Sequence, residues 1–411
     1  MAGPRVFISC AELSGDRHAA KLAVAIRALR PDVVLEGIGG EAMRAAGVDV
    51  RHETVRKARM GLGAFLRARE VLGILRDTRE HFRRAGPPAL VVCCDSWTMN
   101  KHVLALAREV GAPTLYYVSP QVWASRAGRV RRMRELIDRM AVILPFEEPW
   151  LRERGLDATF VGHPLFDELP AEAPAFDPAA RFPGRPPIIA LPAGSRRKVA
   201  EQNFPRQLEV ARLVRAEFPR ATFVTPTVAA THGIVSRLAA GLDGVTVKQD
   251  AFDELVGGSD LAVCVSGTAT LHTAALGVPL VAVYVGSRFL WHALGRWAID
   301  TRTFALVNWL HPRREHVVRE FIPWFGDPRP VAAHVLDWLR HPEKLAAQRA
   351  AQAAVVDPLR RRGASENAAR IAVEMLARAN PAPGATASPG GEAVSGDRRS
   401  TASPSGEAVA P

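Results

Sequence analysis

Two successive series of short apolar segments, each alternating with helix-forming stretches, constrain the fold of this 411-residue chain most strongly. The first series is Val6–Cys10, Val33–Glu36, Leu90–Cys94, Thr114–Val118 and Met140–Leu144. The second is Ile188–Leu191, Thr222–Thr225, Val245–Val247, Leu261–Val265 and Leu280–Tyr284. Strands that alternate with helices predict a parallel sheet, so two series predict two doubly wound, Rossmann-like α/β domains. Their carboxyl strand ends should face a common cleft, which is where ligands bind in such sheets.

A proline-rich stretch between the two series indicates a linker between domains. We expect an N-terminal domain over residues 1–168, the linker over 169–187 and a C-terminal domain over 188–345. Residues 346–379 should form helices that cross back to the N-terminal domain. Residues 380–411 are rich in Pro, Ala, Gly, Ser and Glu, which predicts a disordered tail.

The apolar runs, the cysteines and the net charge of the chain indicate a cytoplasmic protein with an anionic partner. No apolar run reaches the roughly 18–20 residues that span a bilayer, and the first strand begins without a signal-peptide segment. The four cysteines lie in apolar runs without metal-ligand spacing, which favours buried thiols in a cytoplasmic protein. A formal net charge of +12 favours an anionic partner, such as nucleic acid, a phosphorylated substrate or an anionic membrane surface.

The turn after the first strand, residues 11–16, has the form of a ligand-binding strand–turn–helix unit. Ser14 is expected to cap a helix over residues 18–29, whose free N–H groups suit an anion or a sugar hydroxyl. Gly15 allows the turn, and Glu12 and Asp16 place two carboxylates beside it. Alternatively, these residues only reverse the direction of the chain.

Two turns in the second series have the same form. Gly194 and Ser195 follow its first strand and precede Arg196, which could clamp a phosphate. Ser266–Ala269 follows Leu261–Val265 and opens a helix whose N–H groups could bind a diphosphate, with His272 expected in its first turn. Alternatively, these are solvated loops and His272 is a packing residue.

Asp95 ends the strand Leu90–Cys94, at the place where an α/β sheet positions a catalytic carboxylate. Asn100 follows it, and the next strand leads to Ser119 and Trp123. Aromatic residues here could stack on a sugar ring, although they could equally fill the core. His163 follows a further strand, near the end of the N-terminal domain.

Between residues 51 and 84 the chain has ten Lys or Arg residues against four Asp or Glu. Apolar residues recur there at near-helical spacing, at Leu62, Phe65, Leu66, Leu72 and Leu75. A basic amphipathic helix of this type can lie on an anionic membrane surface, or it can pack on its own sheet. No base-reading module accompanies the charge, so nucleic acid is not an expected partner.

Taken together, these motifs resemble the lipid-A-disaccharide synthases, bacterial glycosyltransferases of the glycosyltransferase-B fold. The matching segments are Glu12–Asp16, Gly37–Gly40 with Met43, Met60–Gly61, Asp95 with Asn100, Tyr117–Ala124, Pro145–Glu147, Gly162–Pro164, Gly194–Arg196 and Ser266–Ala269. Asn308 matches an asparagine of the family's C-terminal domain, and the resemblance covers about residues 5 to 375.

The resemblance implies transfer of 2,3-diacylglucosamine from its UDP derivative to the 6-hydroxyl of 2,3-diacylglucosamine 1-phosphate. The product is a β-1,6 disaccharide, the anomeric configuration inverts, and UDP leaves without a metal or other cofactor. The implied donor-binding residues are Gly194, Ser195, Arg196, Ser266, Gly267, Thr268, Ala269, His272 and Asn308. The implied acceptor-side residues are Ser14, Gly15, Asp16, Met60, Gly61, Asn100, Ser119, Trp123 and His163. Because both substrates carry acyl chains, the basic amphipathic segment is expected to hold a cytoplasmic enzyme at the inner membrane.

The chain departs from the family pattern at two positions. Thr98 stands where the family has an aspartate that is a candidate base, which leaves Asp95 or Glu12 as the catalytic base. His272 stands where the family has a glutamate that is expected on the ribose hydroxyls. Two alternatives therefore remain: a divergent relative with another UDP-sugar or acceptor, and an inactive nucleotide-sugar-binding protein at the membrane.

Overall fold

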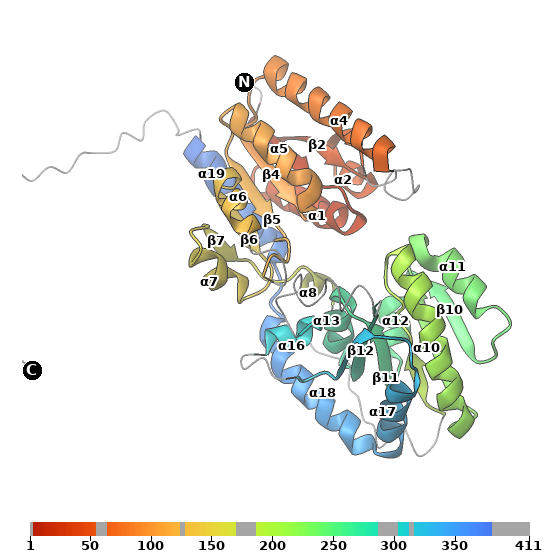
Figure 1. Ribbon diagram of the computed structural model, residues 1–411. Coiled ribbons are helices and arrows are strands. Elements are labelled where there is room, and N and C mark those ends of the chain that lie inside the picture. Colours follow the sequence, from red (N-terminus) through yellow and green to blue (C-terminus); the bar gives the residue numbers. More distant parts are fainter. Residues whose placement is uncertain are drawn as a thin grey trace, which may run out of the picture.

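The computed structural model describes residues 3–54, 64–123, 128–169, 186–286, 303–311 and 316–379, with the backbone only over 64–68. Within these ranges the chain forms two parallel sheets, each flanked by helices (Figure 1). The sequence-predicted α/β class with two doubly wound sheets is confirmed.

The N-terminal sheet has seven strands in the order β3-β2-β1-β4-β5-β6-β7, all parallel. Its strands are β1 (Arg5–Ser9), β2 (Val34–Gly39), β3 (Asp49–Glu53), β4 (Leu90–Cys94), β5 (Thr114–Tyr117), β6 (Arg139–Val142) and β7 (Ala158–Phe160). Its helices are α1 (Leu13–Leu29), α2 (Glu41–Ala45), α4 (Ala64–Ala85), α5 (Trp97–Glu109), α6 (Arg129–Leu136), α7 (Glu147–Arg152) and α8 (Leu165–Glu168).

The C-terminal sheet has six parallel strands in the order β10-β9-β8-β11-β12-β13. Its strands are β8 (Ile188–Ala190), β9 (Thr222–Thr227), β10 (Val245–Gln249), β11 (Leu261–Val265), β12 (Leu280–Val285) and β13 (Glu320–Trp324). Its helices are α10 (Arg197–Glu217), α11 (Ala229–Ala239), α12 (Phe252–Gly257), α13 (Thr268–Ala275), α16 (Leu306–Leu310), α17 (Arg329–Arg340) and α18 (Pro342–Val356), followed by a 3₁₀ turn (Asp357–Leu359) and α19 (Ala364–Ala379).

The central strands of both sheets are apolar throughout because helices cover them on both faces. Every residue of β4 and of β11 is buried. The edge strands β3 and β10 carry polar and partly exposed residues instead. An apolar run in the sequence therefore predicts the buried central strands but not the partly exposed edge strands.

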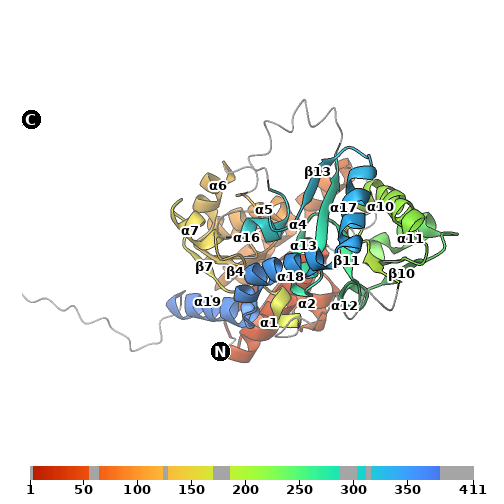
Figure 2. The ribbon, with the colours of Figure 1, turned by 90° about the horizontal axis from the view of Figure 1, so that it is seen from below.

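Helix α19 returns from the C-terminal half of the chain and packs against α1 of the N-terminal domain (Figures 1 and 2). The Asp167 carboxylate accepts hydrogen bonds from the backbone N–H groups of Gly363 and Ala364, at 2.8 and 3.2 Å, just before and at the start of this helix. Arg139 on β6 also pairs with Glu374 at 2.7 Å. The last helix thus ties the C-terminal part of the chain to the first sheet.

Two strands, β3 and β13, are absent from the sequence-based expectation, each for a physical reason. β3 reads Asp-Val-Arg-His-Glu and lies at a sheet edge, so it needs no apolar run. β13 is an edge strand that contains Pro323, whereas β7, the strand expected before His163, is present and has three residues. The first helix also begins at Leu13, five residues before the predicted start at His18.

No helix among the described residues is both long and apolar enough to cross a membrane.

Candidate active site

The sequence-predicted turns lie at the switch point of each sheet. β1 and β4 are neighbours in the first sheet, and the strand order runs outward in opposite directions from them. β8 and β11 have the same relation in the second sheet. Ligands of doubly wound sheets bind beyond the carboxyl ends of such strand pairs. The turns after β1 and β4 and those after β8 and β11 therefore form the candidate site.

The turn after β1 brings α1 against the end of β4. Ser14 lies inside the first turn of α1, and its hydroxyl donates a 3.0 Å hydrogen bond to Oδ2 of Asp95. The prediction that Ser14 caps the helix is wrong, because Glu12 holds the N-cap position and makes no side-chain capping bond. A Cβ on Gly15 would lie 3.3 Å from Cβ of Asp95 and 3.4 Å from the carbonyl oxygen of Cys94. Glycine at this position therefore permits the close approach of α1 to Asp95.

Asp95 is held in an unusual backbone conformation at the end of β4. Its φ is +56°, in the left-handed region that non-glycine residues rarely occupy. The buried amide of Asn100 donates to the carbonyl oxygens of Cys94 and Asp95, at 3.0 and 3.1 Å, and the Tyr116 hydroxyl also donates to Asp95. Strain of this kind persists where surrounding contacts determine the conformation, and it is concentrated at functional sites.

Asp16 is committed to a structural contact. Its side chain is 1% exposed and accepts hydrogen bonds from the backbone N–H groups of Gly40, Ala42 and Met43, at 2.8, 3.0 and 3.2 Å. A carboxylate at a helix N-terminus stabilises that helix, which here is α2. The structure thus places Asp16 beneath the turn instead of on its open face.

Arg196 and Glu12 meet across the two domains. Nη2 of Arg196 lies 3.6 Å from Oε2 of Glu12, and the two side chains are 78% and 48% exposed. Gly194 precedes this arginine with φ +97°, and a Cβ there would lie 2.9 Å from Cγ1 of Val199. Glycine is thus needed for the tight turn that presents Arg196 to the N-terminal domain.

The turn after β11 opens α13 as predicted. Gly267 occupies the N-cap position with φ +147°, and the Thr268 side chain next to it is exposed. The Ser266 hydroxyl instead donates to the carbonyl oxygen of Phe304 at 3.1 Å. The N–H groups and the exposed hydroxyl at the start of α13 are therefore the groups available to an anion.

His272 lies in the second turn of α13, not in the first turn as predicted. Its ring stacks on Phe252, with centroids 4.3 Å apart, and its Nε2 lies 2.7 Å from Oδ1 of Asp253. The hydrogen bond with His272 lowers the pKa of Asp253. The sequence singled out His272, but no local pattern in it shows that Asp253 is its partner.

Three other predicted residues are buried and hydrogen-bonded. The Asn308 amide is 0% exposed and bonds both backbone groups of Val318 and the Glu320 carboxylate. The Ser119 hydroxyl donates to the Pro120 carbonyl oxygen at 3.2 Å. Burial lowers the pKa of His163 to about 3, so this imidazole is neutral. The structure does not bring these three side chains to the open face of the turns.

Trp123 belongs to an aromatic contact between the domains. Its ring centroid lies 4.9 Å from that of Phe146 and 4.5 Å from that of Trp309 on α16. Its indole N–H donates a 3.0 Å hydrogen bond to the fully buried carboxyl of Glu147, which also accepts from the Leu144 N–H. Burial raises the pKa of Glu147 to about 7, and these hydrogen bonds oppose the shift only partly. Glu147 thus holds one side of the domain contact in place.

We expect the stability of this protein to depend on the titration of Glu147. The folded state keeps a proton up to about pH 7, whereas an ordinary glutamate releases it near 4.5. The stability contribution is therefore complete below pH 4.5 and is lost as the pH rises to about 7, by roughly 1.4 kcal/mol per pH unit.

The measurement is urea unfolding of the wild type and of the Glu147→Gln variant across this range. The free energy of unfolding of the wild type should fall relative to that of the variant as the pH rises. A difference that stays constant with pH would contradict the assignment.

The remaining predicted residues belong to the basic amphipathic segment, which the structure describes only in part. Met60, Gly61 and Leu62 fall outside the described residues, as do the side chains of Phe65 and Leu66. On α4, the Leu72 side chain is 65% exposed and Leu75 is half-buried against the core. Among the residues that the structure describes, no cluster of three or more His, Cys, Asp or Glu is placed to hold a metal.

Sequence comparison relates this chain to a known enzyme family. The profile of the lipid-A-disaccharide synthetase family matches residues 6–375. The lipid-A-disaccharide synthase of Geobacter sulfurreducens is 36% identical over 380 residues, covering 91% of this chain and 98% of the relative. That of Geobacter metallireducens is 35% identical over 379 residues, with the same coverage.

A solved structure supports the fold. The UDP-GlcNAc 2-epimerase of Neisseria meningitidis, in a structure bound to UDP-GlcNAc, superposes with a TM-score of 0.53 at 11% identity, covering 91% of this chain and 99% of the epimerase. At this identity the likeness concerns the two-domain architecture alone. With the family match over nearly the whole sequence-predicted range, it leads to one assignment: this chain belongs to the lipid-A-disaccharide synthetase family.

Proposed function

We propose that this enzyme transfers 2,3-diacylglucosamine from its UDP derivative to the 6-hydroxyl of 2,3-diacylglucosamine 1-phosphate. The anomeric configuration inverts and UDP is released. Family membership supports the reaction type. The observation that carries the proposal is the Arg196–Glu12 contact, because it places the donor-side and acceptor-side turns against each other. Both groups are partly exposed, so a substrate can reach them.

In this proposal the C-terminal domain binds the donor diphosphate. Arg196 supplies two parallel N–H donors to phosphate oxygens, and the N–H groups at the start of α13 add partial positive charge. These groups stabilise the charge that develops on the leaving UDP. Thr268 adds an exposed hydroxyl at the same turn.

We further propose that His272 and Asp253 together take the place of the family's glutamate at the ribose. A histidine alone offers one donor to a sugar hydroxyl, but the paired Asp253 carboxylate adds a charged acceptor 2.7 Å away. The stack on Phe252 fixes the orientation of the imidazole ring. The pair therefore reproduces a carboxylate near the end of the donor turn.

Asp95 is our candidate for the general base. Its carboxylate lies at the end of β4, is oriented by the Ser14 hydroxyl and is only partly buried. Thr98 is exposed in the first turn of α5, but a hydroxyl cannot accept a proton near neutral pH. An inverting transfer needs a base on the acceptor hydroxyl while the diphosphate leaves.

Glu12 has a different task in this proposal, because its carboxylate faces Arg196. A diphosphate carries more negative charge than one carboxylate and binds the guanidinium bidentately, so it displaces Glu12. Glu12 is then released beside the acceptor, where it can bind a sugar hydroxyl. Donor binding would therefore prepare the acceptor site.

Purified full-length protein incubated with the UDP-diacylglucosamine donor and the monosaccharide 1-phosphate tests the proposal. We expect disaccharide and UDP in equal amounts. If UDP binds but no disaccharide forms, the chain either uses another acceptor or donor, or is an inactive nucleotide-sugar-binding protein; the replacements Thr98 and His272 favour these alternatives.

We also propose that α4 holds the enzyme at the cytoplasmic surface of the inner membrane. The helix carries Leu72 at 65% exposure amid a strongly basic segment, which suits an anionic interface. Leu72→Ser should lower the partition coefficient onto anionic phospholipid vesicles by roughly 10–100-fold, since the free energy of burying one leucine is roughly 1.5–3 kcal/mol.

Leu242→Ser is a matched control, because Leu242 is 45% exposed but lies in the C-terminal domain. Co-sedimentation with vesicles measures the partition of both variants. Equal behaviour of the two would show that α4 has no special role at the membrane.

A further inference from the structure

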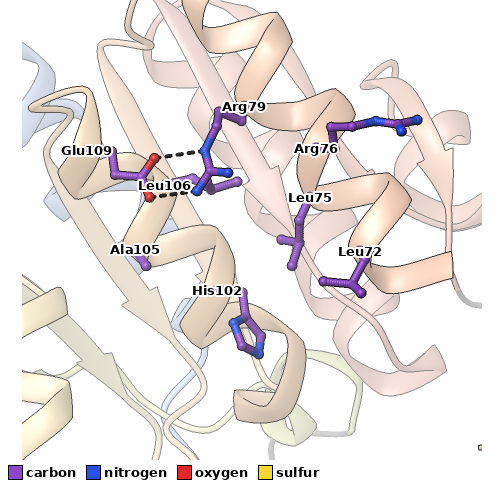
Figure 3. A pocket seen from close by; sticks show the side chains of 8 residues that line it. All are labelled: Leu72, Leu75, Arg76, Arg79, His102, Ala105, Leu106 and Glu109. Atoms are coloured by element: carbon purple, nitrogen blue, oxygen red, sulfur yellow. Dashed lines mark hydrogen bonds and ion pairs between the residues drawn. The ribbon is translucent and has the colours of Figure 1, made fainter. Parts of the chain in front are cut away.

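A groove between α4 and α5 lies outside the four turns of the candidate site. It has a volume of about 360 Å³, and half of its eight lining residues are apolar while the other half are Arg76, Arg79, His102 and Glu109 (Figure 3). The apolar lining residues are Leu72, Leu75, Ala105 and Leu106. The groove thus exposes an apolar surface in a strongly basic part of the chain.

An ion pair joins the two helices at one end of the groove. Nε and Nη2 of Arg79 donate to the two carboxylate oxygens of Glu109, at 2.9 and 2.8 Å (Figure 3). This bidentate geometry fixes both side chains more firmly than a single contact. An apolar ligand in the groove would therefore end at a charged wall.

The other end of the groove points toward the candidate site. α5 starts at Trp97, directly after the Asp95 turn, and His102 at the groove lies one helical turn beyond Thr98. α4 runs in the same direction as α5, so Leu72 lies at the His102 end of the groove and Arg79 at the Glu109 end (Figure 3). At 1.5 Å per residue, the apolar wall from Leu72 to Arg79 is about 10 Å long.

The size and lining of the groove favour an alkyl chain over a protein partner. A volume of 360 Å³ is at the low end for ligand pockets. A partner protein would need about 800 Å² of surface on each side, more than so short a groove provides. A linear alkyl chain needs no hydrogen bonds and gains about 0.8 kcal/mol for each buried methylene.

We propose that the α4–α5 groove binds one acyl chain of the acceptor, and that the Arg79–Glu109 pair limits the length of that chain. The proposal rests on the proposed function, since the acceptor is its diacylated sugar. The acceptor, and not the donor, is favoured because the groove starts from the Asp95 side of the cleft. The donor turns belong to the other domain.

Ala105→Phe, which fills the middle of the groove, tests the proposal. We compare the KM for the long-chain acceptor with the KM for the same sugar phosphate carrying acetyl groups. The long-chain KM should rise at least tenfold, equivalent to 1.4 kcal/mol. The KM for the acetylated acceptor and the KM for the donor should not change.

Ala85→Phe is the matched control, because Ala85 is an exposed residue at the far end of α4. It should leave both acceptor KM values unchanged. Equal effects of Ala105→Phe on both acceptors, or no effect on either, would overturn the groove assignment.

Two further measurements keep the proposal testable if Ala105→Phe does not fold. Removing both charges in the Arg79→Ala, Glu109→Ala double variant should shift the preferred acyl chain to greater length, and an unchanged preference would contradict the length limit. An acceptor with a diazirine at its chain end should cross-link to residues 72–79 or 102–109, and cross-links elsewhere would contradict the groove. Because cross-linking needs no turnover, it separates a failure of the groove from a failure of the proposed reaction.

Discussion

Replacing Asp95 with asparagine should lower kcat by about 10²–10⁴-fold, the usual contribution of a positioned general base. Asparagine keeps the size of the side chain, and its amide oxygen can still accept the Ser14 hydrogen bond. It cannot take a proton from the acceptor hydroxyl. The affinity for UDP should therefore stay unchanged, because the donor turns lie in the other domain.

Steady-state kinetics and UDP titration calorimetry measure the two effects separately. Asp243→Asn serves as a control, because Asp243 is exposed on the C-terminal domain away from the site. If the Asp95→Asn variant retains wild-type kcat, Asp95 is not the base, and Glu12 becomes the remaining candidate.

Replacing Arg196 with alanine should raise the KM for the donor by roughly 10–100-fold. The loss of charge-assisted hydrogen bonds to a phosphate costs about 1.5–3 kcal/mol, and each 1.4 kcal/mol is tenfold in affinity. The KM for the acceptor should change much less. Since Arg196 is 78% exposed, its removal should leave the thermal stability nearly unaltered.

The adjacent Arg197 provides the control for charge. Its guanidinium pairs with Glu201 within α10, at 2.7 Å, and so it is directed away from the proposed phosphate position. Arg197→Ala removes the same charge from the same region. If both variants raise the donor KM equally, general electrostatic attraction explains the effect and a specific clamp does not.

The sequence could predict where the site lies because parallel strands expose their carboxyl ends at one edge. Glu12, Asp95, Arg196 and Ser266 each follow an apolar strand, and the observed strand orders place all four turns at switch points. The family resemblance, now confirmed by the match over residues 6–375, adds the reaction type. The individual roles of these residues remain predictions.

Contacts between distant segments could not be predicted in the same way. Asp16 is separated from its partner Gly40 by 24 residues, and nothing in a local pattern shows that this carboxylate caps α2. The Arg196–Glu12 contact depends on how the two domains meet. Asn308 matches a family residue, yet only packing shows that its amide is buried against Val318.

The two departures from the family pattern, Thr98 and His272, differ in whether a nearby carboxylate can replace the lost one. His272 replaces the family's glutamate, but the Asp253 carboxylate lies beside it, so a negative charge is still present at the donor turn. Thr98 is exposed and has no carboxylate beside it in the first turn of α5, so our proposal assigns the proton transfer to Asp95. The chemistry of the base is therefore where this chain should differ most from its relatives.

The stereochemistry and linkage of the product test the central claim most directly. Proton and carbon NMR of the disaccharide formed by the purified enzyme reports both the anomeric configuration and the acceptor oxygen. The account predicts a β-configured bond to O6 of the sugar 1-phosphate. An α-configured product, a bond to another hydroxyl, or release of UDP without transfer to this acceptor would contradict it.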